Sequence, residues 1–84
     1  MPQMRVQIRL FAILREKAGM SELPLEVRQS STVASVAEQL ASQLPSISDL
    51  LPRVAFAVNR QYAGRETILH DGDELALIPP VSGG

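Results

Sequence analysis

The chain has 84 residues, of which 45% are hydrophobic and 20% are charged, and its formal net charge is -1. A chain of this length and composition forms a single small globular domain and has no room for an enclosed substrate cavity beside its core. The near-neutral charge excludes the basic surface that a nucleic-acid partner requires. We therefore expect one domain over residues 1–84.

Several other classes of protein are excluded by residue content. No apolar run approaches the roughly 20 residues that span a bilayer, and the N-terminus lacks the pattern of a signal peptide. The chain has no cysteine and one histidine, so it cannot build a disulfide framework or a zinc site from those ligands. We expect a cytoplasmic protein with no bound metal and no membrane partner.

The first predicted element is a strand from Met4 to Leu10, where apolar and polar residues alternate as they do in a strand with one buried face. Residues 11–14 break that alternation and lead into residues 15–19, whose charges and glycine indicate the turn of a hairpin. A second alternation over residues 23–27 predicts the return strand. Because Pro24 has no amide hydrogen to donate, this strand should lie at a sheet edge.

A helix is predicted next, because apolar residues recur at helical spacing at Val33, Val36, Ala37, Leu40 and Leu44. Residues 30–32 offer hydroxyl side chains as N-caps, and Pro45 ends the helix. Two prolines bracket residues 46–51, which predicts an irregular connection with one helical turn whose leucines cover the core.

The second half of the chain predicts a strand, a short return strand and a final strand, with a weak strand or bridge before the last one. Residues 54–58 are almost continuously apolar, which predicts a strand covered on both faces, and residues 59–60 open a turn after it. Tyr62 begins a short return, residues 66–69 predict a weak strand or bridge, and the final strand runs from residue 74 to 78.

These elements predict an α+β fold, in which a mixed sheet of four to five strands packs on one main helix. A right-handed crossover through the helix would place the last strand parallel to the first, in the middle of the sheet. That arrangement is the β-grasp, or ubiquitin-like, fold. Its last strand is held on both sides, so a segment that follows it would leave the domain at a fixed place.

Residues 79–84 form the predicted extended tail of this domain. Pro79 and Pro80 fix the backbone and should direct the tail away from the body. Gly83 and Gly84 have no Cβ, so they could be threaded into a narrow channel of another protein. The alternative is that small residues gather at chain ends without a function.

The sequence offers few groups for catalysis. His70 lies in a predicted turn beside Asp71 and Asp73, where a solvated side chain is expected, and the serines have no nucleophile motif around them. We therefore expect no complete catalytic site in this chain. Phe11, Tyr62 and Ile78 are open to two interpretations: Phe11 and Ile78 fall out of phase with the core pattern, so the three residues either form an exposed docking patch or finish the core.

Residues 71–84, with the sequence DGDELALIPPVSGG, closely resemble the C-terminus of the small subunit of molybdopterin synthase, a ubiquitin-like sulfur carrier. Residues 9–16 and 56–59 are similar to an early and a central strand of that family. Aliphatic residues 77–78 depart from relatives that often have aromatics there, which affects the shape of the docking patch rather than the chemistry.

The resemblance implies a role for each part of the tail. Gly84 would be adenylated, converted to a thiocarboxylate, and would donate sulfur to cyclic pyranopterin monophosphate in molybdenum cofactor biosynthesis. The tail residues that would enter the partner's active site are Pro79, Pro80, Val81, Ser82 and Gly83. The resemblance also favours docking over core for Phe11, Tyr62 and Ile78.

The partners implied by the family are the large subunit of molybdopterin synthase, in a heterotetramer, and an adenylyltransferase related to ubiquitin-activating enzymes. The large subunit would supply the catalytic residues, so this chain would be a sulfur-donating subunit without catalytic groups of its own. It would bind no cofactor, and the activating partner would use ATP. Three alternatives stay open: a sulfur carrier for thiamine thiazole synthesis, a ubiquitin-like protein modifier, and a plain binding module.

Overall fold

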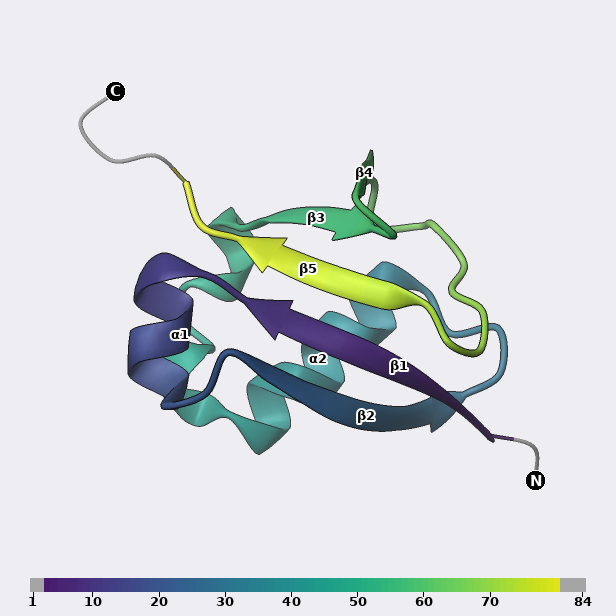
Figure 1. Ribbon diagram of the computed structural model, residues 1–84, viewed down its shortest axis with the longest axis horizontal. Helices are drawn as coiled ribbons and strands as arrows, with labels where there is room; N and C mark the ends of the chain where they lie inside the picture. The colour runs from purple at the N-terminus through teal and green to yellow at the C-terminus, as the bar shows by residue number, and fades with distance from the viewer. Residues whose placement is uncertain (1–2, 81–84) are drawn as a thin grey trace.

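The computed structural model describes residues 3–80, which form a five-stranded mixed sheet and two α-helices (Figure 1). The elements in chain order are β1 (Gln3–Leu10), α1 (Ala12–Ala18), β2 (Glu22–Arg28), α2 (Val33–Gln43), β3 (Ala55–Val58), β4 (Gln61–Ala63) and β5 (Glu74–Ile78). Two short 3₁₀ helices, Pro45–Ile47 and Leu51–Arg53, connect α2 to β3.

The sheet has the strand order β2-β1-β5-β3-β4. The central strand β5 pairs with β1 in parallel and with β3 in antiparallel orientation, and β1 and β2 form an antiparallel pair. The predicted β-grasp arrangement, with the last strand parallel to the first in the middle of the sheet, is therefore confirmed. The predicted position of β2 at an edge is also confirmed.

The register of β1 and β2 explains why β2 tolerates Pro24. Gln7 on β1 is the partner of Pro24, and the Gln7 amide donates away from β2, to the Asp73 carbonyl at 2.9 Å. Such a pair exchanges no hydrogen bonds in an antiparallel ladder, so the ring nitrogen of Pro24 faces outward. The missing amide hydrogen costs the sheet nothing and makes this edge a poorer template for another strand.

The core lies between the sheet and α2, which covers the rear face in Figure 1. The helix begins with a capping box, in which the Thr32 hydroxyl accepts from the Ser35 amide and the Ser35 hydroxyl accepts from the Thr32 amide. Four of the five apolar residues predicted for this helix are buried in it, and the fifth, Leu44, is half-buried and lies at the C-cap. The side chains buried between the two layers include Met4, Val6, Ile8, Leu10, Val33, Val36, Leu40, Phe56, Leu75 and Leu77.

The predicted antiparallel pairing of the first two strands is confirmed, but the predicted turn over residues 15–19 is wrong, because Ala12–Ala18 form α1. Leu14 is fully buried, and Ala18, one turn later, packs against the core. Gly19, with a φ of 75°, ends the helix and donates its amide to the Arg15 carbonyl. Seven residues are too few to show helical periodicity against the alternation of β1 and β2.

Most predictions for the second half are confirmed. The connection after α2 contains short helical turns with Leu51 buried, and Thr32 and Ile68 form the expected isolated bridge. β5 has the predicted bounds. The strand β3 begins one residue late, and Ala55 is exposed, so the prediction that both of its faces are covered is wrong at that residue.

Candidate docking surface

The front face of the sheet in Figure 1, which we call the open face, lies opposite α2. The strand registers place one row of partners across this face: Glu22, Arg9, Ala76, Ala57 and Tyr62. The two alanines occupy the centre, and the longer Arg9 and Tyr62 stand on either side of them. The row therefore has two small apolar side chains at its centre, between two long side chains. We call Ala57 and Ala76 together the alanine floor.

The next row along the open face lies at the end of the sheet where β1 and β5 finish. Ile78 is the partner of Ala55, and the register of Leu10 with Leu77, continued by one residue, brings Phe11 alongside Ile78. Phe11 keeps extended backbone angles, so its side chain follows the alternation of β1 onto the open face. We define the open-face patch as Phe11, Ala55, Ala57, Tyr62, Ala76 and Ile78.

The structure thus shows whether Phe11, Tyr62 and Ile78 belong to the core or to the surface. Phe11 is 38% exposed, Tyr62 is 80% exposed and Ile78 is half-buried, and none of them belongs to the buried core cluster. Phe11 and Ile78 lie together, and Tyr62 lies diagonally across the patch. Their role in docking remains a prediction, whereas their exposure is a property of the fold.

The alanines of the patch were missed by the sequence analysis. Ala57 and Ala76 were assigned to strands only as apolar residues, although their positions in the alternation of β3 and β5 place them opposite the core. The signal was their size, because both residues are small and apolar and they are partners on neighbouring strands. Aliphatic periodicity does not detect such a feature.

The other half of the open face is polar, and its polar and charged side chains largely pair with one another. Arg5 pairs with Glu26 at 3.4 Å, and the side-chain amide of Gln7 donates a hydrogen bond to the Glu22 carboxylate at 2.9 Å. At the border with the apolar half, Arg9 Nη1 lies 3.0 Å from Glu74 Oε2. The open face therefore consists of an apolar half on β5, β3 and β4 and a charge-paired half on β1 and β2.

The tail follows β5 at the end of the sheet that carries Phe11 and Ile78. Pro79 is half-buried and Pro80 is exposed, and neither belongs to a strand. The predicted tail residues Val81, Ser82, Gly83 and Gly84 lie outside the described residues. Their insertion into a partner and the chemistry of Gly84 therefore stay predictions.

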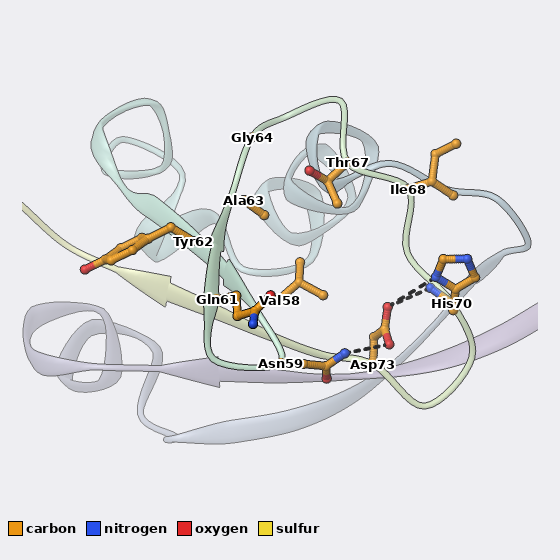
Figure 2. Close-up of a pocket in the computed structure, with 10 residues that line it drawn as sticks. All are labelled: Val58, Asn59, Gln61, Tyr62, Ala63, Gly64, Thr67, Ile68, His70 and Asp73. Carbon is orange, nitrogen blue, oxygen red and sulfur yellow. Dashed lines mark hydrogen bonds and ion pairs between the residues drawn. The ribbon is translucent and has the colours of Figure 1, made fainter.

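A shallow depression of about 560 Å³ lies beside β4, and Tyr62 of the open-face patch is among the residues that line it. Figure 2 shows His70 and Asp73 on one side of it and Tyr62 extending away from them. The side chain of His70 is 80% exposed, and Asp73 accepts hydrogen bonds from the Asn59 side chain and the His70 amide. The carboxylate of Asp73 thus holds two turns together, and His70 is the solvated turn residue that the sequence predicted.

Within residues 3–80, no group of three histidine, cysteine or acidic side chains is placed to hold a metal ion. In the same part of the chain, no helix has the length and apolarity needed to cross a membrane.

The topology and the open-face patch define a ubiquitin-like β-grasp protein with an apolar patch on one face of its sheet. Residues 8–84 match the family model described as the ThiS family. Because the match spans most of the sequence, the chain belongs to the ThiS family.

Two curated relatives are molybdopterin synthase sulfur carrier subunits. That of Arabidopsis thaliana is 35% identical over 79 residues, covering 94% of this chain and 82% of the relative. That of Mycobacterium tuberculosis is 37% identical over 83 residues, covering 95% of this chain and 98% of the relative. The resemblance inferred from the tail and strands is confirmed.

Solved structures extend the comparison to the fold. The crystal structure of SAMP1 from Haloferax volcanii has a TM-score of 0.85 at 31% identity, covering 95% of this chain and 99% of that chain. A complex of subunits 1 and 2 of molybdopterin-converting factor from Helicobacter pylori matches with a TM-score of 0.68 at 23% identity, covering 96% of this chain and 100% of that chain. The similarity covers β1 to β5 and supports the β-grasp fold.

Proposed function

We propose that this chain is the sulfur carrier subunit of a molybdopterin synthase. Curated relatives with that name match it over most of their length. The structural observation that carries the proposal is the position of β5, which is paired on both sides and leads into the tail. A segment that follows a central strand leaves the domain from a rigid point, which suits a chain end that must reach another protein's active site.

In the proposed cycle, the reacting group is the α-carboxylate of Gly84. A free carboxylate is a poor electrophile, so ATP first converts it to an acyl adenylate with release of pyrophosphate. A persulfide sulfur of the donor displaces AMP, and a donor thiol cleaves the resulting acyl disulfide to leave a thiocarboxylate. The sulfur then passes to cyclic pyranopterin monophosphate, and two transfers build the dithiolene of molybdopterin.

The catalytic groups of this cycle belong to partner proteins. An adenylyltransferase related to ubiquitin-activating enzymes uses the ATP, and this chain binds no cofactor. The large subunit docks on the open-face patch and receives residues 79–84 in its active site, in a cytoplasmic heterotetramer. The Helicobacter pylori complex of subunits 1 and 2 supports a large-subunit partner.

The polarity of the open face supports docking at the patch. Protein interfaces have an apolar centre surrounded by a polar rim, and aromatic side chains are enriched at the centre. Here Phe11, Ile78 and Tyr62 surround an alanine floor, and Arg9 with Glu74 forms the border on one side. The tail starts at the same end of the sheet, so docking and tail insertion can occur together.

Intact-mass measurement tests the proposal directly. The purified chain is incubated with the adenylyltransferase, ATP and a persulfide donor, and we expect one oxygen to be replaced by sulfur. Addition of the large subunit and cyclic pyranopterin monophosphate should then return the original mass and yield molybdopterin. A chain that gains sulfur but does not transfer it to the pterin would contradict the assignment to molybdopterin synthase.

A second candidate is a ubiquitin-like modifier, because the SAMP1 structure is similar in fold and 31% identical. In that case Gly84 would form amide bonds with lysines of other proteins, and the same incubation in a cell extract would yield adducts of higher mass. The thiazole alternative predicts that the thiocarboxylate is consumed by thiazole synthesis and not by the pterin. The two named curated relatives favour the pterin.

A further inference from the structure

Arg9 makes two contacts on the open face that link the charged half to the apolar half. Its Nη1 lies 3.0 Å from Oε2 of Glu74, and its Cζ lies 5.4 Å from the centroid of the Phe11 ring. The first contact is a charge-assisted hydrogen bond, and the second has the geometry of a cation–π interaction. One guanidinium therefore joins a carboxylate on β5 to the aromatic ring just beyond β1.

Phe11 needs such a contact, because the core does not hold its ring. Phe11 is the N-cap residue of α1, it makes no side-chain capping hydrogen bond, and it lies outside the buried cluster. The backbone turns sharply after it, since Ala12 has a φ of 51°, in the left-handed region. The position of the ring on this corner thus depends on its neighbours on the open face.

Glu74 in turn restricts the position of the Arg9 guanidinium. The side chains of Arg9 and Glu74 are 38% and 25% exposed, whereas those of the Arg5–Glu26 pair on the same face are 66% and 62% exposed. A less exposed pair at shorter distance is screened less by water and holds its geometry better. The planar guanidinium can then lie on the ring while it keeps its bond to the carboxylate.

We propose that Arg9 is a positioning residue, which Glu74 holds over the Phe11 ring so that the ring is already oriented for a partner before the partner binds. The consequence for docking rests on the proposed function, in which the large subunit contacts Phe11. A side chain ordered in advance loses less conformational entropy on binding, so affinity rises without a contact between Arg9 and the partner.

Binding measurements with the large subunit test the effect on docking. Arg9→Gln should weaken binding about threefold to tenfold, in line with the strength of a cation–π contact. Arg5→Gln is the matched control, because Arg5 lies on the same strand and face and has its own carboxylate partner but no aromatic ring; its affinity should match that of the parent chain. Equal losses for the two variants would overturn the proposal, because general charge would then explain both.

A double-mutant cycle separates positioning from direct contact. In a Phe11→Ala background, Arg9→Gln should have no further effect on affinity. An undiminished loss in that background would show that Arg9 touches the partner itself, and would overturn the proposal. Arg9→Lys keeps the charge but lacks the planar group, so it should restore only part of the affinity; full restoration would also contradict the role of stacking.

The nuclear magnetic resonance signals of the ring give a readout that needs no partner. Arg9→Gln should shift the Phe11 ring signals and leave those of Phe56 unchanged, whereas Arg65→Gln should do the reverse, since Arg65 lies 5.4 Å from the Phe56 centroid. Unmoved Phe11 signals would refute the positioning role. If they move but Phe11→Ala leaves large-subunit binding intact, the docking role in the proposed function fails, and the proposal that Arg9 prepares the ring for a partner fails with it.

Discussion

Ala57 on β3 and Ala76 on β5 are register partners in the middle of the open face, and they are only 6% and 9% exposed although α2 covers the other face. Their methyl groups lie low between Tyr62, the second partner of Ala57, and Arg9, the second partner of Ala76. The centre of the open face is therefore apolar and built from small side chains. In the proposed complex, this pair of alanines would lie at the centre of the surface that the large subunit meets.

Ala76→Leu should therefore block docking without unfolding the domain. The larger side chain would project from the centre of the open face, and we expect the affinity for the large subunit to fall about tenfold or more, which corresponds to roughly 1.4 kcal/mol or more. Calorimetric titration with the large subunit measures the loss. Gln7→Leu, on the polar half of the same face, is the control and should bind normally. Parent-like binding by Ala76→Leu would show that the partner does not occupy the floor.

Leu10 and Phe11 are adjacent in sequence but should respond oppositely to truncation. Leu10 is 1% exposed and points into the core, so Leu10→Ala should lower the free energy of unfolding by about 3 kcal/mol. Phe11→Ala should cost only about 1 kcal/mol, since Phe11 is 38% exposed and lies outside the buried core cluster. Urea denaturation followed by circular dichroism measures both values. A loss for Phe11→Ala as large as that for Leu10→Ala would make Phe11 a core residue and remove it from the docking patch.

Of the residues in the β3–β4 turn, Asn59 should contribute most to the free energy of unfolding. Its side chain donates to Asp73 at 2.9 Å and accepts from the Glu74 amide at 3.0 Å, and its φ is 51°. Asn59→Ala loses both bonds and retains the backbone strain, so the free energy of unfolding should fall by about 2 kcal/mol. Urea titration measures this change.

Arg60 provides the control for that turn. Its φ of 72° also lies in the left-handed region, but no side-chain hydrogen bond ties it to another residue within the described part of the chain. Arg60→Gly should relieve strain and raise the free energy of unfolding by about 0.5 kcal/mol. If Asn59→Ala proves as harmless as Arg60→Gly, the link from Asn59 to Asp73 and Glu74 does not stabilise the domain.

Some of the features on which these predictions depend could be predicted from the sequence, and others could not. The strand β1 and the helix α2 were predictable because each buries one face, and burial imposes a period of two or of about 3.6 on the apolar residues. The strand β5 was predictable as a short apolar run after an Asp-Gly turn. The edge position of β2 followed from the missing amide hydrogen of Pro24. Such features depend on local chemistry, which the sequence displays directly.

The features that were not predicted depend on contacts between distant segments. The helix α1 buries one fully enclosed side chain, Leu14, and its exposed residues Arg15, Glu16 and Lys17 suit a loop equally well. The alanine floor exists only because β5 lies between β1 and β3, which brings residues 57 and 76 together. Exposure of Phe11 could be suspected from its phase, but the position of Arg9 over its ring also involves Glu74, which β5 brings beside β1 from 65 residues away.

Removing Gly84 should abolish sulfur loading while the fold remains intact. The final strand ends at Ile78, and its ladder contacts with β1 and β3 involve residues 74–78 only, so loss of the last residue leaves the sheet unchanged. The shortened chain ends in Gly83, one residue short of the position that the adenylyltransferase must reach. Intact-mass measurement after incubation with that enzyme, ATP and the donor should show no exchange of oxygen for sulfur, and the melting temperature should match that of the parent.

An alanine added after Gly84 is the complementary variant, because it keeps every residue of the tail but moves the carboxylate onto a residue with a Cβ. We expect this variant also to stay unloaded, since a narrow channel that accepts glycine excludes the larger residue. Ser82→Ala is the matched control, because it alters the tail without changing its length or its terminal glycines, and it should load normally. Normal loading of both the shortened and the extended chain would place the sulfur chemistry somewhere other than the terminal carboxylate.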